Sequence, residues 1–394
     1  MDDELQAELE ALRSAGLYRR HRVSETPQGV HMRIDGQDLL SFCSNDYLGL
    51  ANHPDLREAL CHAVERYGVG SGSAHLVNGH SRLHAECEDR LAEFTGRERA
   101  LLFSTGYMAN LAVPTALCNR HDAIFQDRLD HASLIDGARL SDARLLRYRH
   151  GDLRQLESQL NTQSEARRRL IMVDGVFSMD GDRADLKGLA ALAEQYDAWL
   201  MVDDAHGFGV LGERGAGLCE VEGLDAGQVP ILMATLGKAV GVSGAFVAGS
   251  HALVETLIQR ARSYIFTTAA PPALSAAVIK SLELIESEAW RRDKLRTLIA
   301  YLREQAQAKG IELMPSDTPI QPLVVGDNER ARRISEALFE KGLLVPAIRP
   351  PTVPEGTARL RITLSATHET GDIDRLLEAI APLLEATADE SPAT

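Results

Sequence analysis

A lysine, an imidazole and a carboxylate follow two short hydrophobic runs of this 394-residue chain. Asp203 and His206 come directly after Trp199-Leu200-Met201-Val202, and Lys238 follows a second run that ends at Met233. Glycine and alanine residues surround the lysine in the segment 234–245, where they leave little bulk beside its stem. Most lysines lie on protein surfaces. The small neighbours favour a different interpretation, in which Lys238 contacts a large planar ligand.

An amine, an acid and an imidazole are the groups that a pyridoxal phosphate enzyme needs. The amine forms a Schiff base with the cofactor, and the acid keeps the pyridine nitrogen protonated so that the ring can take up electrons. The imidazole can contact the hydroxyl edge of the ring. These residues therefore predict pyridoxal phosphate as the cofactor, with Lys238, Asp203 and His206 in the three roles.

The segment Ser104-Thr105-Gly106-Tyr107-Met108-Ala109-Asn110 follows a predicted strand and opens a predicted helix. Free N–H groups at a helix N-terminus attract anions, and Gly106 allows close approach. Thr235 lies near Lys238 in the sequence and can hydrogen-bond a phosphate. The segment thus indicates a phosphate site, although ordinary helix capping explains it equally well.

Other polar segments have simpler explanations. Asp127–His131 and Asp203–His206 resemble sets of metal ligands, but metal centres usually need three or more converging ligands, so we predict no metal. A histidine at a strand end, such as His131, can instead lie flat on an aromatic cofactor.

The glycine-rich segment 68–73 reads G-x-G-x-G, which does not match a dinucleotide loop and indicates a loop approached by substrate or a neighbouring subunit. A turn accounts for most of the acidic and glycine residues in 174–182, but it does not explain Ser178.

Short apolar runs alternate with longer helical patterns between residues 44 and 270. This pattern is typical of βαβ units and predicts an α/β fold with a mostly parallel, seven-stranded sheet. Ligands of such sheets bind beyond the carboxyl ends of the strands. The predicted strands are Ala100–Phe103, Ala123–Gln126, Arg144–Arg147, Leu170–Asp174, Leu200–Val202, Ile231–Ala234 and Ala245–Ala248.

The flanking sequence predicts further units. An amphipathic helix over 3–18 is expected to pack on another element, and we assign residues 1–43 to a segment that packs with the small domain. Residues 44–270 form the predicted cofactor-binding domain. Residues 271–384 form a smaller α+β domain, with helices over 273–308, 328–341 and from 371, and strands in 343–348 and 358–364. Residues 385–394 lack apolar content and are predicted to be disordered.

Composition excludes several classes of protein. The net charge of −15 argues against general nucleic-acid binding, which depends on basic residues. The chain has no apolar run long enough to span a membrane and no secretory signal, so we expect a cytoplasmic protein that does not bind membranes. Five widely spaced cysteines fit neither a disulfide framework nor a thiolate zinc site.

Taken together, six segments resemble the α-oxoamine synthases, which are fold-type I pyridoxal phosphate enzymes. The resemblance spans nearly the whole chain in the right order. It implies a homodimer that joins an amino acid to an acyl thioester with loss of carbon dioxide. The segments are SNDYLG (44–49), STGYMAN (104–110), D-x3-HAS (127–133), DGVFSMDGD (174–182), VDDAHG (202–207) and TLGKAVGVSG (235–244). One departure is Asp174, where many relatives have glutamate.

The resemblance also implies roles for matching residues. Lys238 would bind the cofactor covalently, Asp203 would pair with the pyridine nitrogen, and His131 would stack on the ring. His206 and Ser178 would contact the hydroxyl edge of the ring. The phosphate would be held by the backbone of Gly106 and Tyr107, by Thr235, and by Thr267 or Thr268 of a second subunit. Asn45 and Arg361 would bind the amino-acid carboxylate, and Arg19 and Thr352 would contact the substrate.

Two segments narrow the resemblance within the family. Residues 320–328 and 347–354 look most like the member of the biotin pathway, which implies L-alanine and a pimeloyl thioester as substrates, carried on coenzyme A or an acyl carrier protein. The basic cluster Arg147–His150 is a candidate for docking the acidic carrier protein. Three alternatives remain at this stage: condensation of glycine with an acetyl thioester, an aminotransferase reaction, and non-catalytic binding of a small molecule.

Overall fold

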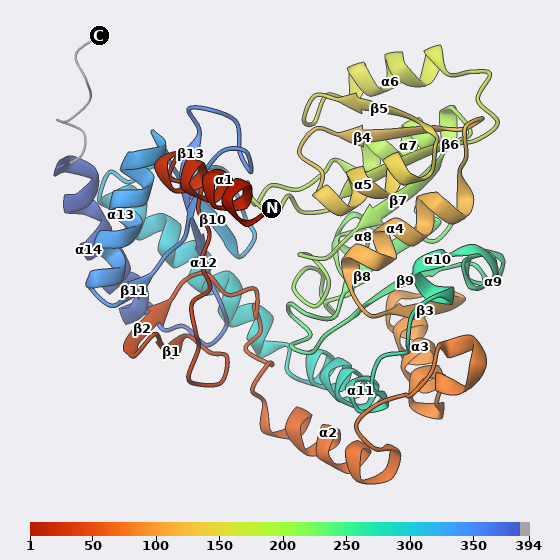
Figure 1. Ribbon diagram of the computed structural model, residues 1–394, viewed down its shortest axis with the longest axis horizontal. Coiled ribbons are helices and arrows are strands. Elements are labelled where there is room, and N and C mark those ends of the chain that lie inside the picture. The colour runs from red at the N-terminus through yellow and green to blue at the C-terminus, as the bar shows by residue number, and fades with distance from the viewer. Residues whose placement is uncertain (387–394) are drawn as a thin grey trace.

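The computed structural model describes residues 1–386, which form a large lobe around one wide sheet and a smaller lobe around two narrow sheets (Figure 1). The predicted disordered tail, 385–394, lies outside the described residues except for its first two positions. Those two positions belong to the last helix, α14 (Thr370–Ala386). None of the described helices combines the length and apolar character that crossing a membrane requires.

The large lobe contains the predicted seven-stranded sheet, in the order β3-β9-β8-β7-β6-β4-β5. Each predicted strand is confirmed to within one residue at either end. Only β9 runs antiparallel to its neighbours, so the sheet is mostly parallel, as predicted. The strands are β3 (Arg99–Phe103), β4 (Ala123–Asp127), β5 (Arg144–Tyr148), β6 (Arg169–Asp174), β7 (Trp199–Asp203), β8 (Ile231–Thr235) and β9 (Ala245–Gly249).

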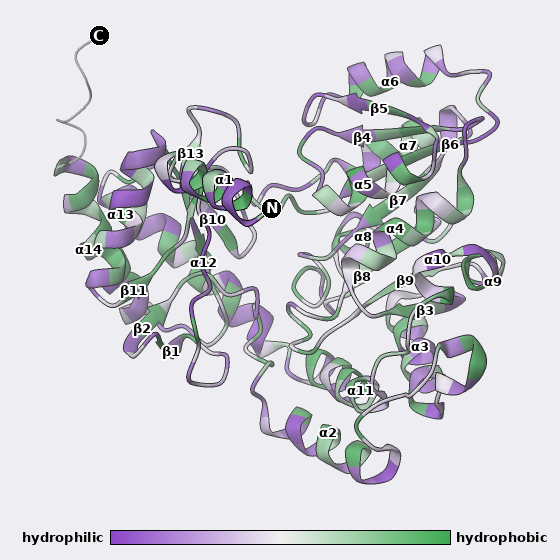
Figure 2. Cartoon of the chain, in the orientation of Figure 1, coloured by the Kyte–Doolittle hydropathy of each residue, from purple (hydrophilic) through white to green (hydrophobic). Residues whose placement is uncertain are grey.

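Helices cover both faces of this sheet, which explains why its strands are continuous hydrophobic runs. The core on one face includes side chains of α4, α5, α9 and α10, and the core on the other includes side chains of α6, α7 and α8. Figure 2 shows the hydrophobic residues concentrated in the central strands and the hydrophilic ones on outer helices such as α6. These helices are α4 (Gly106–Leu117), α5 (Ala132–Leu140), α6 (Leu153–Thr162), α7 (Leu186–Gln195), α8 (Leu218–Glu222), α9 (His251–Arg260) and α10 (Arg262–Ile265).

Three more helices extend the large lobe below the sheet (Figure 1). Helix α11 (Pro272–Ser287) packs against α2 (Pro54–Tyr67) and α3 (Arg82–Thr95). A single turn of π-helix, η1 (His75–Gly79), precedes α3. Helix α11 therefore lies with the large lobe in space, although it follows the boundary predicted at residue 270.

The small lobe combines both ends of the chain. One sheet has the order β10-β13-β12 and the other the order β1-β2-β11, in which the N-terminal β2 pairs with the C-terminal β11. The strands β1, β2 and β10 were missing from the sequence prediction. The elements are β1 (His31–Ile34), β2 (Gln37–Ser41), α12 (Trp290–Ala308), β10 (Ile320–Gly326), α13 (Asn328–Glu340), β11 (Leu343–Leu344), β12 (Ala347–Ile348) and β13 (Ala358–Thr363).

The N-terminal helix differs from the prediction. Helix α1 covers Asp2–Ser14, ends four residues earlier than expected and contains no buried residue. Leu5 and Leu12 are 48% and 41% exposed. The prediction that this helix packs on another element was therefore wrong for the chain taken alone. A narrow leucine stripe among acidic residues gives the helix little apolar area to bury.

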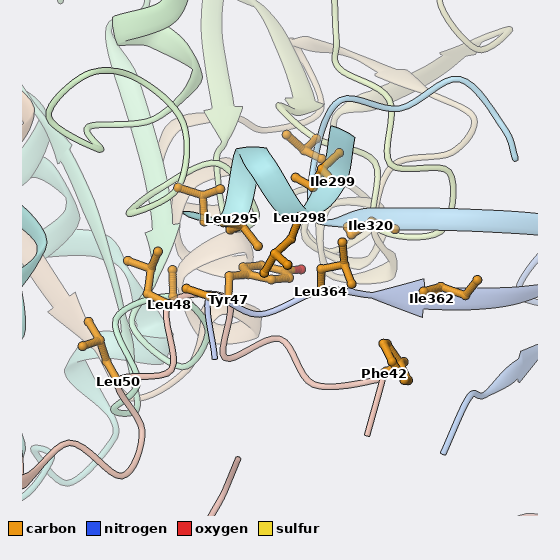
Figure 3. Close-up of a cluster of buried hydrophobic side chains, with 14 of the residues drawn as sticks. Phe42, Tyr47, Leu48, Leu50, Leu295, Leu298, Ile299, Ile320, Ile362 and Leu364 are labelled. Atoms are coloured by element: carbon orange, nitrogen blue, oxygen red, sulfur yellow. The ribbon is translucent and has the colours of Figure 1, made fainter. Parts of the chain in front are cut away.

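One part of the hydrophobic core fixes a segment that leads into the site (Figure 3). Phe42, Tyr47 and Leu48 are fully buried against Leu295 and Leu298 of α12 and against strands of the small lobe. Burying aromatic and aliphatic side chains of this size stabilises by roughly 1.5–3 kcal/mol each. The segment 42–50 is thus held firmly between the two lobes.

Candidate active site

Lys238 lies just beyond β8, at the carboxyl edge of the sheet. Its Nζ atom donates a hydrogen bond to Nε2 of His206 at 2.8 Å. Burial lowers the pKa of Lys238 to about 8, and the nearby carboxylates of Asp203 and Asp174 offset part of this effect. The amine is therefore partly neutral near physiological pH. The turn after the lysine requires glycine, because Gly241 has a φ of +74° and a β-carbon there would lie 2.6 Å from the backbone nitrogen of Ala51.

A chain of hydrogen bonds continues from Lys238 across the site. The ring nitrogen Nδ1 of His206 lies 2.6 Å from the hydroxyl of Tyr47, which donates to Oδ1 of Asn45 at 3.1 Å. Burial and the charge of Lys238 hold the pKa of His206 well below its usual range, so the ring is neutral. With Nε2 accepting from the lysine, Nδ1 carries the proton and donates to Tyr47. Tyr47 was not predicted as a site residue, although it lies in the segment 44–49 that resembles the α-oxoamine synthases.

Arg361 joins this chain from the small lobe. Its guanidinium donates from Nη2 to Oδ1 of Asn45 at 3.3 Å and from Nε to the carbonyl oxygen of Ser178 at 2.6 Å. Arg361 lies on β13, whereas Ser178 follows β6 of the large sheet. The structure therefore brings three predicted site residues from both lobes into contact.

Asp203 ends β7 and is 5% exposed. Its Oδ2 accepts from Nδ2 of Asn110 at 2.7 Å, and its Oδ1 accepts from the backbone of Ala205 at 3.0 Å. Nδ2 of Asn110 also donates to Oγ of Ser133 at 2.8 Å, and Oγ of Ser133 contacts Nδ1 of His131 at 2.7 Å. Sequence analysis assigned no role to Asn110 or Ser133. The spacing of Asn110, one helical turn after Gly106, was the available signal.

Two further buried acids support the backbone around His131. Oδ2 of Asp174 accepts from the backbone N–H of His131 at 2.8 Å, and Oδ1 of Asp130 accepts from that of Asp174 at 3.0 Å. Burial raises the pKa of both carboxyl groups far above the usual value, and the neighbouring acids raise it further. This pair fixes the loop after β4 against the end of β6.

One cavity of about 190 Å³ lies among these residues, although Asn45, Tyr47 and Arg361 are not part of its lining. The N-terminus of α4 opens onto it, where Oγ1 of Thr105 caps the N–H of Met108 at 3.2 Å. The first N–H groups of a helix have no partner within the helix and attract an anion. The cavity is lined by Gly106, Tyr107, Asn110, His131, Ser133, Asp174, Ser178, Asp203, Ala205, His206, Met233, Thr235 and Lys238.

The set of groups around this cavity fits pyridoxal phosphate. A lysine amine with a lowered pKa, a buried carboxylate and a helix N-terminus are the partners of its aldehyde, its ring nitrogen and its phosphate. Lys238, Asp203 and α4 supply them from three different elements. No larger rearrangement of the chain is needed to bring them together.

Four other expected residues lie elsewhere. Arg19 and Thr352 are exposed and are not among the residues that line the cavity. Thr267 is half-buried, and the exposed Thr268 pairs with Ala74 in an isolated bridge near the glycine-rich segment. The chain alone therefore does not place any of them beside Lys238.

The basic cluster Arg147–His150 is largely engaged within the chain. Arg147 donates to the carbonyl oxygen of Arg128, and Arg149 forms an ion pair with Asp152 at 3.0 Å. His150 contacts Asp127 at 3.2 Å and Asp182 at 2.8 Å, and these two carboxylates raise the pKa of His150 to about 10. The cluster thus offers less free positive charge than its sequence suggests.

Known proteins similar to this chain belong to one family. Residues 37–380 match the family described as aminotransferase class I and II. The 8-amino-7-oxononanoate synthase of Nitrosococcus oceani is 59% identical over 96% of this chain and 100% of its own length. That of Saccharophagus degradans is 55% identical over 99% of this chain and 98% of its own length.

Solved structures show the same fold. A serine palmitoyltransferase from Sphingomonas wittichii superposes with a TM-score of 0.92, at 32% identity over 98% of both chains. The 8-amino-7-oxononanoate synthase from Francisella tularensis superposes with a TM-score of 0.79, at 34% identity over 89% of this chain and 99% of its own. The chain therefore belongs to the class I and II aminotransferase family and, within it, to the group of the 8-amino-7-oxononanoate synthases.

Proposed function

We propose that this protein condenses L-alanine with a pimeloyl thioester, releasing carbon dioxide and the free thiol carrier, and forms 8-amino-7-oxononanoate for biotin biosynthesis. Its cofactor is pyridoxal phosphate. One observation carries the proposal: Lys238, Asp203 and the N-terminus of α4 line a single cavity in a chain that is 59% identical to a named 8-amino-7-oxononanoate synthase.

Each wall of the cavity has a role in holding the cofactor. Lys238 supplies the amine that binds it, and Asp203, fixed by Asn110, faces the ring nitrogen. The N–H groups of Gly106 and Tyr107, with the hydroxyl of Thr235, hold the phosphate. His131 would cover one face of the ring, and His206 and Ser178 would hold its hydroxyl edge. When bound, the cofactor withdraws electrons from the α-carbon of the amino acid.

The chain's own residues then select and activate the substrate. Arg361 and Asn45 bind the carboxylate of alanine, because the guanidinium and the amide converge from opposite lobes. Lys238 removes the α-proton, and its lowered pKa keeps part of the amine neutral and able to accept it. The chain of His206, Tyr47 and Asn45 holds the amine and the carboxylate site in a fixed relation. Arg19 and Thr352 contact the pimeloyl thioester.

We further propose that the protein is a cytoplasmic homodimer that accepts its acyl group from coenzyme A or an acyl carrier protein. Val77 and Phe266 are 78% and 70% exposed, as expected for side chains that a second subunit covers. Light scattering of the purified protein should give twice the mass of one chain. All five cysteines are free, in keeping with a reducing compartment.

The direct test combines alanine with pimeloyl-coenzyme A, or with the pimeloyl carrier protein, and follows product mass, thiol and carbon dioxide. We expect the 8-amino-7-oxononanoate mass with equal amounts of carbon dioxide and thiol. Parallel reactions with glycine and an acetyl thioester should be much slower. A Lys238→Ala variant should lose both the cofactor absorbance and turnover. Faster reaction with glycine and acetyl thioester, or full turnover by the variant, would refute the proposal.

A further inference from the structure

Three histidines form a cluster outside the catalytic cavity. His75 lies in η1, and His80 and His84 flank the start of α3. One nitrogen from each lies within 4.8 Å of the other two, and the Nδ1 atoms of His75 and His80 face each other at 2.9 Å. His80 and His84 are four residues apart, with His80 in the extended segment before α3 and His84 in its first turn. The sequence prediction of no metal missed this pair.

Neighbouring side chains hold the rings in place. His75 stacks on Tyr264, with ring centroids 4.9 Å apart and planes at 16°. His80 stacks on His84 at 5.5 Å and 29°. Rings held in fixed positions need little rearrangement to bind an ion, so the cluster has the preorganisation of a ligand site.

The second nitrogen of His80 has a carboxylate behind it. Nε2 lies 3.9 Å from Oε2 of Glu88, whose other oxygen accepts from the backbone of Leu102 at 3.0 Å. Histidine ligands of metals commonly donate their other N–H to a carboxylate, which orients the ring and strengthens the ligand. At 3.9 Å this pair is too long for a hydrogen bond, so Glu88 takes this role only if the two side chains move closer when Nδ1 of His80 binds an ion.

Nδ1 of His75 and Nδ1 of His80 are the primary ligand atoms, because they already lie 2.9 Å apart. Without an ion, one of these nitrogens carries the proton of their hydrogen bond, and this proton must move to Nε2 of the same ring when an ion binds.

His84 is a more costly ligand. Its Nδ1 accepts from the backbone N–H of Ser81 at 2.9 Å, and its Nε2 donates to the carbonyl oxygen of Ala270 at 2.8 Å. Binding a metal through Nδ1 requires loss of the bond to Ser81. The complete site is therefore expected to bind its ion reversibly, unlike a structural zinc site with free ligands.

We propose that His75, His80 and His84 bind one divalent transition-metal ion of the zinc class. The site is separate from the cavity around Lys238 and does not depend on the proposed reaction. It lies where the glycine-rich segment meets residues 268–270: Oγ of Ser71 donates to the carbonyl oxygen of Ala270 at 2.6 Å, and the backbone of Ala269 donates to Ser73 at 2.9 Å. A bound ion would join η1 to the start of α3, beside these two segments.

The test titrates tag-free holoenzyme with zinc by calorimetry and measures bound metal after dialysis. We expect one ion per chain, with a Kd on the order of 10 µM. His80→Ala removes the most accessible ligand and should weaken binding at least about tenfold, and Glu88→Gln should weaken it about tenfold through His80. His121→Ala, which changes an exposed histidine far from the cluster in sequence, is the matched control and should bind as the wild type does.

Two further measurements keep the result interpretable. The melting temperature of His80→Ala without metal should equal that of the wild type, which shows that the variant folds. Zinc should slow amide hydrogen exchange in residues 70–80 of the wild type only. Absence of stoichiometric binding by the wild type would overturn the proposal, as would equal affinity in His80→Ala, which would assign the ion to another site such as the exposed Cys61.

Discussion

The residues expected at the active site fall into two groups that the structure treats differently. Those at the ends of the large sheet's strands, such as His131, Asp203 and Lys238, line one cavity. Those on the N-terminal segment and in the turn after β12, Arg19 and Thr352, are exposed and lie outside it. Arg361 and Asn45 connect the lobes through a hydrogen bond.

This difference follows from how each group is supported. The strand-end residues are held by a sheet buried on both faces, where a change in register would move every buried side chain. The N-terminal helix buries no residue in this chain, and the segment that follows it is exposed and held by single contacts, such as the hydrogen bond from Arg349 to the carbonyl oxygen of Gly16 at 2.9 Å. Cofactor chemistry thus depends on the core of one chain, and we expect acyl recognition to depend on parts that a second subunit or the substrate must order.

The largest effect on activity is expected from removing the negative charge of Asp203, one of the residues at the strand ends. Asp203→Asn removes the carboxylate that we propose to pair with the ring nitrogen but keeps a group that can bond Asn110. Loss of one preorganised electrostatic partner typically lowers kcat by about 10²–10³-fold. Steady-state kinetics should show this decrease, with a shift in the absorption spectrum of the bound cofactor.

Asp204, the residue that follows Asp203, provides the matched control. Burial raises the pKa of Asp204 to about 8, and its Oδ2 accepts from the backbone of Leu218 at 2.7 Å. Asp204→Asn resembles the protonated acid that already predominates near neutral pH, so turnover should change little. Equal loss of activity in both variants would show that neither position accepts an amide side chain. That result would contradict a specific role for Asp203.

Much of the large lobe was predictable because its signals are local. Each strand there is a short apolar run, and the polar group after it is visible in the sequence, as at Val202-Asp203. Strand β2 contains Gln37 and Asp38, is half exposed and pairs with the distant β11, so no local pattern indicated it. Asn110 and Tyr47 were missed for a related reason: their roles come from contacts with Asp203 and His206, far away in sequence.

A second prediction concerns the residues that join the two groups. Arg361→Ala removes a guanidinium that bonds Asn45 and the carbonyl oxygen of Ser178. Charge-assisted hydrogen bonds are worth roughly 1.5–3 kcal/mol, so the KM for alanine should rise by about 10–100-fold. The KM for the thioester should change little. Arg361→Lys keeps the charge without the planar fork and should recover only part of the loss.

If both KM values rose together in Arg361→Ala, the arginine would be holding the lobes in place and would not be specific for the amino acid. Thermal unfolding separates these two cases. If the arginine only holds the lobes together, the melting temperatures of Arg361→Ala and Arg361→Lys should fall by different amounts. The substrate preference of both variants should then stay the same as that of the wild type.

A smaller effect is expected from the exposed group. Arg19→Ala and Thr352→Ala should leave cofactor binding and melting temperature unchanged, since neither side chain is buried. Exposed polar contacts contribute up to about 1 kcal/mol, so the KM for the thioester should rise at most about fivefold. A much larger rise, measured with the same thioester at saturating alanine, would show that these residues enter the cavity in the assembled enzyme and would narrow the contrast between the two groups.

The smallest effect is expected at His150, beyond the edge strand β5. Asp127 and Asp182 raise the pKa of its ring from 6.5 to about 10. The charged ring therefore stabilises the folded state fully below about pH 6.5, and this contribution is lost as the pH rises toward 10. A third of the side chain is exposed, so solvent screening limits the effect to about 1 kcal/mol. Melting curves of His150→Gln should fall below those of the wild type at pH 6 and approach them at pH 9.5. Arg149→Gln, whose arginine stays charged throughout this range, should show a small difference that does not depend on pH. If the melting temperature of His150→Gln also differed from that of the wild type by the same amount at every pH, packing and not the two ion pairs would account for the stabilisation by this histidine.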